Sequence, residues 1–230
     1  MTMRLGLLTT VFLAGGALMS LEMASFRLVE PEFGSGIEVW GSLISVFLGG
    51  LAIGAVAGGW LADRRPALWK LGLVLLAGGA VTAILPLCSD PVFAFTFPGE
   101  GAPLPPEWLA PSAAEGTGGQ ITIYQPPDLR WPALTAGAIL FGLPAILLGM
   151  VSPYAARLFV HQLPNMGSGV GQVYGVSTVG SIIGTLGTAF YLVSWMGTTW
   201  LLALNGLLLA ALGLVLTAAH ALCRDRHPAA

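Results

Sequence analysis

The sequence is poor in charge. Asp, Glu, Lys and Arg make up 9% of its 230 residues, whereas a soluble domain carries roughly 25%. This scarcity excludes a cytosolic enzyme, and the lack of a basic patch excludes a nucleic-acid-binding protein. Cysteine is almost absent too: Cys88 and Cys223 are too few for a disulfide scaffold or a metal cluster. The three histidines do not have the spacing of metal ligands. We therefore expect no metal site and no cofactor.

Hydrophobic residues, by contrast, make up 55% of the chain. That share excludes disorder, and the apolar residues gather in runs long enough for a membrane helix, which needs about 20. The pattern predicts an all-α polytopic membrane protein with six transmembrane helices. The fourth run is longer than one span and contains Pro144 and Pro153, so we expect a kink or an early end in it. The runs cover residues 5–29, 37–61, 68–87, 131–160, 168–195 and 198–222.

These runs divide the chain into helices 1–3 (residues 1–87), an external Pro/Gly-rich segment (88–130), helices 4–6 (131–222) and a tail (223–230). In the external segment, two stretches alternate apolar or aromatic residues with small or polar ones, and they predict two short strands, paired as a hairpin. These strands would form a cap over the helices; the alternative is a long loop without structure of its own. The stretches are Phe93–Phe95–Phe97 and Ile121–Ile123.

The distribution of basic residues predicts the orientation. With a cytoplasmic amino terminus, seven basic residues lie inside and only Arg130 lies clearly outside, as the positive-inside rule requires. No A-x-A cleavage site follows the first run, so we expect this run to be a retained helix. The sequence thus predicts a multi-pass protein of the cell inner membrane, with both termini cytoplasmic and residues 88–130 outside. The seven inner basic residues are Arg4, Arg64, Arg65, Lys70, Arg157, Arg224 and Arg226.

Glycine is abundant, with 32 residues, and much of it recurs every four residues. This spacing puts each set on one face of a helix, where it allows close helix packing. A hinge or a substrate path is the alternative. The residues we assign to helix packing are Gly50, Gly54 and Gly58 on the second helix, and Gly171, Gly175, Gly180 and Gly184 on the fifth.

Two charged residues, Glu22 and Arg27, lie within the first apolar run. An ionisable group at membrane depth is costly and usually faces the bundle or a cavity. Glu22 is either structural or a cation or proton site, whereas Arg27 is near enough to the surface to reach Glu30. We expect Glu22 to find its partner on the fifth helix, which has the densest set of intramembrane polar groups. These are Tyr174, Ser177, Thr178, Ser181 and Thr185.

Four motifs carry a family resemblance. They are EMASFRLVEP (22–31), GGWLADR (58–64), LGMVSPYAARL (148–158) and GQVYGVSTVGSIIGT (171–185). In this order they resemble the transmembrane half of the membrane-anchored, transporter-fused spermidine-synthase-like proteins. The resemblance covers the first, second, fourth and fifth helices. It implies a bundle resembling half of a major-facilitator transporter. The inner loop of such a transporter has an acid and a base that latch a gate, which Asp63 and Arg64 resemble here; a plain stop-transfer cluster is the alternative. Arg157, which we group with this inner-loop motif, ends the fourth run and is expected to anchor it at the inner interface.

The family also carries a cytosolic aminopropyltransferase-like domain after the last helix. The printed sequence ends at Ala230, so we expect that domain to be absent and the chain not to be an enzyme on its own. We expect a membrane scaffold or accessory subunit that docks a partner protein or a larger membrane complex. The alternatives are a homo-oligomeric transporter of a small solute, such as a polyamine or another cation, and an anchor for a separate aminopropyltransferase. The expected partners are the lipid bilayer, other membrane subunits or a second copy, and a soluble synthase-like protein.

Overall fold

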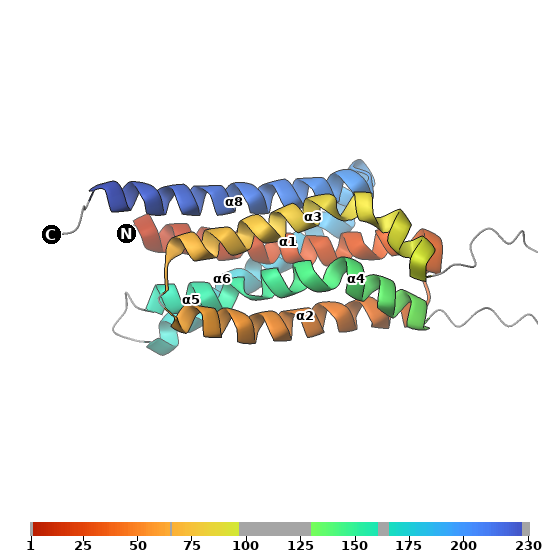
Figure 1. Ribbon diagram of the computed structural model, residues 1–230, viewed down its shortest axis with the longest axis horizontal. Helices are drawn as coiled ribbons and strands as arrows, with labels where there is room; N and C mark the ends of the chain where they lie inside the picture. Colours follow the sequence, from red (N-terminus) through yellow and green to blue (C-terminus); the bar gives the residue numbers. More distant parts are fainter. Residues whose placement is uncertain (1, 65, 97–129, 161–165, 227–230) are drawn as a thin grey trace, which may run out of the picture.

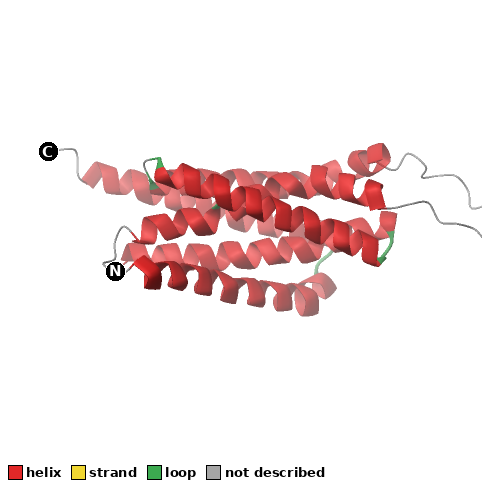
Figure 2. Cartoon of the chain, turned by 90° about the horizontal axis from the view of Figure 1, so that it is seen from below, coloured by secondary structure: helices red, strands yellow, loops and turns green. Residues whose placement is uncertain are grey.

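The computed structural model describes residues 2–64, 66–96, 130–160 and 166–226, and these residues are almost entirely helical, without a strand (Figures 1 and 2). The helices are α1 (Thr2–Phe33), α2 (Ile37–Asp63), α3 (Leu68–Thr96), α4 (Arg130–Gly149), α5 (Val151–Val160), α6 (Met166–Gly187), the π-helical turn η2 (Thr188–Leu192), α7 (Val193–Trp195) and α8 (Thr198–Arg226).

Among the described residues, six helical segments are long and apolar enough to cross a membrane, which confirms the predicted all-α class and the six predicted spans. Helices α4 and α5 form one segment, and α6, η2 and α7 form another. Both chain termini lie at the same end of the bundle (Figure 1), as an even number of spans requires. We call this the terminal end, and the opposite end, where α1 turns into α2, the turn end.

The turn between α1 and α2 depends on Gly34. This residue has a φ of +77°, a left-handed conformation that favours glycine. Its N–H donates to the Glu30 carbonyl at 2.8 Å and so closes the last turn of α1. The chain then starts α2 within a few residues, which places Trp40, in the first turns of α2, beside the end of α1.

The interruption expected in the fourth span is present. Helix α4 ends at Gly149 and α5 begins at Val151, with Met150 between them. The Met150 N–H is shared between the carbonyls of Ile146 and Leu147, at 3.2 and 3.3 Å. Pro153 lies in the first turn of α5 and has no N–H to continue the α4 hydrogen-bond ladder. Pro144, in contrast, lies inside α4 without ending it.

The predicted hairpin is wrong in its first strand. Helix α3 continues past Leu87 to Thr96, so Phe93 and Phe95 are helical. Pro86 and Pro91 lie inside this helix, because neighbouring groups can satisfy the backbone that a proline leaves free in a membrane helix. Helical geometry also buries Phe93 against Phe33 of α1, with ring centroids 5.6 Å apart. The remaining residues of the predicted hairpin, Phe97, Ile121 and Ile123, lie outside the described ranges.

Glycines mediate the close packing of helix pairs. The most extensive contacts join α3 to α8, α2 to α4, and α1 to α6. On α2, a Cβ at Gly50 would lie 2.5 Å from the Ala145 Cβ, and one at Gly58 would lie 2.6 Å from the Met150 carbonyl oxygen. A Cβ at Gly54 would overlap the Ile146 carbonyl oxygen. The three glycines therefore face α4 and its break, and the two backbones touch.

The other two pairs are built in the same way. Gly180 and Gly184 of α6 lie against the α1 backbone at Phe12 and Gly16. On α3 and α8, Gly79 meets Gly206 and Gly72 meets Gly213, and the added Cβ of either Gly79 or Gly72 would lie within 3 Å of the facing carbonyl oxygen. The two glycines of each helix are seven residues apart, so the backbones of this antiparallel pair stay close over two helical turns.

The packing assignment is wrong for Gly171 and Gly175 within this chain. Both are exposed, and a Cβ added at either would have no atom within 4 Å. The reason is the direction that each glycine faces. Gly180 and Gly184 face α1, whereas Gly171 and Gly175 lie on a side of α6 that no described helix covers.

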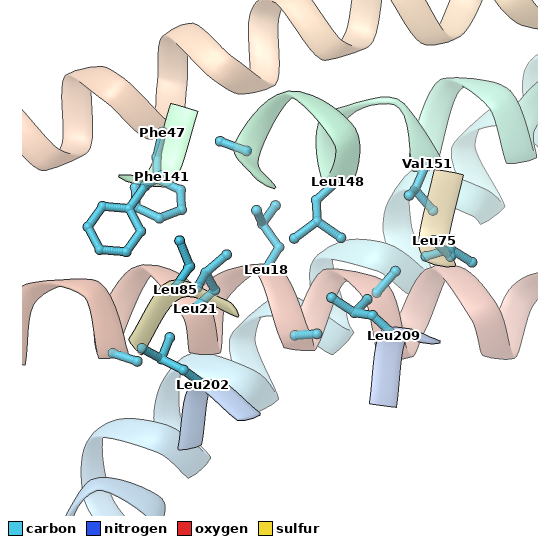
Figure 3. Packing of buried hydrophobic residues seen from close by; sticks show 14 of the residues in the cluster. Leu18, Leu21, Phe47, Leu75, Leu85, Phe141, Leu148, Val151, Leu202 and Leu209 are labelled. Atoms are coloured by element: carbon cyan, nitrogen blue, oxygen red, sulfur yellow. The ribbon is translucent and has the colours of Figure 1, made fainter. Parts of the chain in front are cut away.

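Buried apolar side chains of α1, α2, α3, α4, α5 and α8 fill the space between the pairs (Figure 3). Phe47 of α2 stacks on Phe141 of α4 with ring centroids 5.8 Å apart, and both side chains are fully buried. Leu18 of α1 and Leu148 of α4 lie beside each other in Figure 3 and line one cavity. The core is therefore apolar along the α1–α4 contact, and the polar groups gather elsewhere.

Adjacent glycines of α2 test the packing account. We expect Gly58→Ala to lower the free energy of unfolding by about 1–3 kcal/mol, because its methyl group would collide with the Met150 backbone. Gly59→Ala is the matched control: its methyl group meets nothing within 4 Å, and alanine stabilises a helix interior by roughly 0.5–1 kcal/mol. Unfolding of both variants in detergent measures the difference, and equal stability would contradict the account.

Candidate functional site

A cavity of about 320 Å³ lies at the turn end, and a second of about 200 Å³ lies at the interruption between α4 and α5. The second, which we call the break cavity, is lined by residues of α1, α2, α4, α5 and α6. It contains two of the predicted polar residues, Tyr174 and Ser177. The Ser177 hydroxyl lies 3.2 Å from the Ser152 hydroxyl across the α5–α6 contact. The structure thus brings α6 hydroxyls to the break of the fourth span.

The break cavity offers oxygen atoms and no charge. In a continuous helix, the Gly149 carbonyl would accept a hydrogen bond from the N–H of residue 153. Residue 153 is a proline and has no N–H, so this carbonyl lacks its usual helical donor. Ser152, Ser177 and Tyr174 add hydroxyl groups, and no lining residue is ionisable at neutral pH. Interrupted membrane helices bind ions and polar solutes through such released backbone groups. The arrangement can therefore hold a small polar solute or a weakly bound cation, but it cannot perform acid–base chemistry.

The remaining three predicted polar residues of α6, Thr178, Ser181 and Thr185, make hydrogen bonds to backbone carbonyls. Ser181 donates to the Gly15 carbonyl at 3.2 Å and joins α6 to α1. Thr178 is exposed and donates at 2.8 Å to the Tyr174 carbonyl of its own helix. Thr185 donates at 2.9 Å to the Ser181 carbonyl of its own helix. None of the five predicted side chains makes a hydrogen bond to the Glu22 carboxylate.

Glu22 is half-buried, and its carboxylate makes no hydrogen bond or ion pair with any described residue. The expected partner on the fifth span is therefore missing. At this level of the fifth span the available hydroxyl is that of Thr188, and it donates to Ser20 at 2.7 Å instead. Glu22 shares its side of α1 with Leu18 and Ser25, which are both buried. An unpaired carboxylate on the packed side of a membrane helix is a candidate binding group.

A buried polar cluster joins three spans, and the sequence reasoning missed it. Ser20 of α1 accepts hydrogen bonds from Thr188 of η2 at 2.7 Å and from the Asn205 amide of α8 at 2.9 Å. All three side chains are at most 6% exposed. The sequence does contain a sign of this cluster: Asn205 is the only side-chain amide in the sixth apolar run, and such a group needs a hydrogen-bond partner in a membrane. The cluster fixes α1, η2 and α8 together at membrane depth.

Polar residues of the predicted inner-loop motif also meet in space at the terminal end. Arg157 of α5 lies 3.2 Å from Asp63 at the end of α2. The Tyr154 hydroxyl accepts from the Ala67 N–H at 3.0 Å and donates to the Ala67 carbonyl at 3.1 Å. Arg64 does not join the ion pair, because its guanidinium lies over the Trp60 ring, 3.7 Å from the centroid. The α2–α3 link is thus tied to α5.

At the turn end, Arg27 lies 3.6 Å from Glu30 on its own helix. A second ion pair there joins Arg130 of α4 to Glu38 of α2 at 2.9 Å.

No group of three or more His, Cys, Asp or Glu side chains among the described residues could hold a metal ion.

Removing one hydroxyl tests the tie at the terminal end. We expect Tyr154→Phe to lower the free energy of unfolding by about 1–3 kcal/mol, because Ala67 loses the partner of both its backbone groups. The matched control is Tyr191→Phe, because the Tyr191 side chain is exposed and its hydroxyl makes no hydrogen bond with the described residues. Faster hydrogen exchange of the Ala67 amide in Tyr154→Phe alone would support the tie. Equal exchange in both variants would refute it.

Comparison of the chain with protein-family models, curated proteins and solved structures gave no match. The family resemblance of the four motifs therefore stays a prediction.

Proposed function

We propose that this chain is an integral membrane scaffold or accessory subunit that docks another membrane-embedded subunit through α6. One observation carries the proposal. In the most apolar stretch of the span from Met166 to Trp195, 11% of the residues are buried within the chain, against 50% in the span of α1. The uncovered side of this span includes glycines and polar side chains, which lipid tails do not favour, in addition to apolar ones. We call Gly171, Gln172, Gly175 and Thr178 the open face of α6; all four are exposed.

The composition of the open face favours a protein neighbour over lipid. Lipid tails give helices no hydrophobic reason to associate, so membrane helices associate through small residues and interhelical hydrogen bonds. Gly171 and Gly175 leave room for a second backbone. The Gln172 amide makes no hydrogen bond to any described residue, and a neighbouring helix would supply one. A glycine and a side-chain hydrogen bond also occur together where α6 packs against α1, at Gly180 and Ser181.

The partner follows from the same reasoning. A membrane-embedded helix with small residues fits the open face, and a second copy of the chain has such a helix. Two copies would form a twelve-helix assembly of the major-facilitator type implied by the motif resemblance. A soluble synthase-like partner would instead meet the terminal end, where Asp63, Arg64 and Arg157 lie. No contact of the described residues favours that anchor role over the scaffold role.

A second candidate function is the transport of a small solute, such as a polyamine or another cation. It is favoured by the break cavity, with its released backbone and hydroxyl groups, and by the unpaired carboxylate of Glu22. In this reading the second copy completes the pathway. Loss of solute uptake in Glu22→Gln, with unchanged folding and assembly, would support transport over a purely structural module.

The mass of the protein in mild detergent tests the docking proposal. We expect native mass spectrometry to find assemblies larger than the 23.8 kDa chain. Gly175→Leu and Gln172→Leu should release the monomer, because they fill the gap and remove the amide. Ala211→Leu, on the exposed side of α8, is the matched control and should assemble normally.

Each outcome of that measurement has a meaning. A twofold mass supports a homo-oligomer, and a larger complex supports the accessory-subunit role. A monomeric wild-type protein, both in mild detergent and after cross-linking in membranes, contradicts the proposal.

We also propose that the protein lies in the cell inner membrane with both termini cytoplasmic and residues 88–130 outside. In a variant with Cys88 and Cys223 replaced by alanine, Gly116→Cys should react with an impermeant maleimide added to intact cells. The basic residues of the terminal end motivate this orientation. Labelling that appears only after lysis would reverse it.

A further inference from the structure

The cavity at the turn end is separate from the break cavity and from the open face of α6. It has a volume of about 320 Å³ and is lined by Met23, Phe26, Arg27, Glu30, Trp40, Ala189 and Val193. This volume is at the lower end of ligand pockets, which span about 300–1,000 Å³. The aromatic wall is ordered, since the Phe26 and Trp40 rings have centroids 4.3 Å apart. The opposite wall comes from the π-helical turn, and such turns recur at functional sites.

Three polar groups of this cavity are without hydrogen bonds to the described residues. The Arg27 guanidinium lies 3.6 Å from the Glu30 carboxylate, beyond the 2.7–2.9 Å of a charge-assisted hydrogen bond. The two side chains remain 54% and 36% exposed. The indole N–H of Trp40 makes no hydrogen bond to the described residues either, and the Trp40 ring packs against Phe26. A positive group, a negative group and an N–H donor thus surround one aromatic-walled space.

The depth of this cavity matches the membrane surface. Arg27 is six residues from the end of α1 at Phe33, or about 9 Å along the helix. Head groups occupy the outer part of a bilayer of about 40–45 Å around a hydrocarbon core of about 30 Å. Trp40 fits the same level, because indole rings prefer this interface. This placement holds for either orientation of the protein.

We propose that this cavity binds the head group of a phosphatidylethanolamine molecule. The lipid phosphate would accept hydrogen bonds from the Arg27 guanidinium and the Trp40 indole, and the primary ammonium would donate to Glu30. The Phe26–Trp40 wall would cover the ethylene bridge. Glu30 selects among lipids, since a trimethylammonium group has no N–H to donate and a glycerol head group has no positive charge. Arg27 and Glu30 at 3.6 Å remain loosely paired without the lipid because each has a stronger partner in the head group.

Native mass spectrometry of the full chain, with added phospholipids of identical acyl chains, tests the proposal. We expect the wild-type protein to retain phosphatidylethanolamine at least several-fold more than phosphatidylcholine or phosphatidylglycerol. Arg27→Gln should weaken retention of phosphatidylethanolamine on the order of tenfold. Glu30→Gln should abolish the preference for it over phosphatidylcholine. Arg27 is exposed and Glu30 is partly exposed, so the variants should unfold at the temperature of the wild-type protein.

Glu38→Gln is the matched control, because it removes an ion pair of the turn end without touching the cavity, and it should retain the wild-type preference. Equal retention of the three lipids by the wild-type protein would overturn the proposal. So would an unchanged preference in both cavity variants. Binding of soluble phosphoethanolamine is measured last. If it binds as tightly as the lipid, the site takes a soluble zwitterion and the lipid assignment is wrong. Docking through α6 is measured by protein mass, so the two proposals can fail separately.

Discussion

The structure depends on the close approach of helix backbones. In a bilayer, helices gain nothing from leaving the lipid except packing and hydrogen bonds. Pairing α3 with α8, α2 with α4, and α1 with α6 through glycine provides the packing, because glycine exposes its backbone to the neighbouring helix. Between α1 and α6, the Ser181 hydroxyl adds a hydrogen bond to the Gly15 carbonyl. The resulting contacts leave apolar side chains to fill the centre, as the Phe47–Phe141 stack does. The glycines are thus the first requirement of the fold, and the polar contacts are secondary.

The same pairing decides where polar groups are accessible. Gly54 and Gly58 hold α2 against the interruption of the fourth span, and this contact gives the break cavity a rigid wall. Gly180 and Gly184 fix one side of α6 on α1 and leave the opposite side uncovered. Ser20, Thr188 and Asn205 then lock the π-helical turn at the height where the turn-end cavity begins. A docking role through α6 and a lipid role at the turn end can coexist, because they use different sides of the same span.

Much of the fold could be predicted from the sequence, because hydropathy alone sets the membrane spans. The break near Met150 followed from Pro153, and the contacts of Gly54 and Gly180 followed from a four-residue spacing. The continuation of α3 through Pro91 could not be predicted, since the burial of Phe93 against Phe33 decides it. The α3–α8 glycines have a seven-residue spacing, which a search for four-residue stripes misses.

The candidate site was less predictable for a physical reason. A sequence shows that Glu22 and Ser181 lie on helices, but not how far each helix is rotated about its axis. Ser181 therefore contacts Gly15 rather than Glu22. Gly175 faces outward, because it lies five residues before Gly180 and so about 140° away around the helix. The rotation of α6 against α1 and α5 is set by tertiary packing alone. It determines both the break cavity and the open face.

A disulfide cross-link tests this rotation most directly. The Ser152 and Ser177 hydroxyls lie 3.2 Å apart, so the double variant Ser152→Cys/Ser177→Cys should form an intramolecular disulfide rapidly under mild oxidation in membranes. Ser152→Cys/Thr178→Cys should not, because Thr178 is turned outward. The account predicts cross-linking of the first pair only. Cross-linking of the second pair in preference to the first would show that α6 is rotated differently and would contradict both the break cavity and the open face.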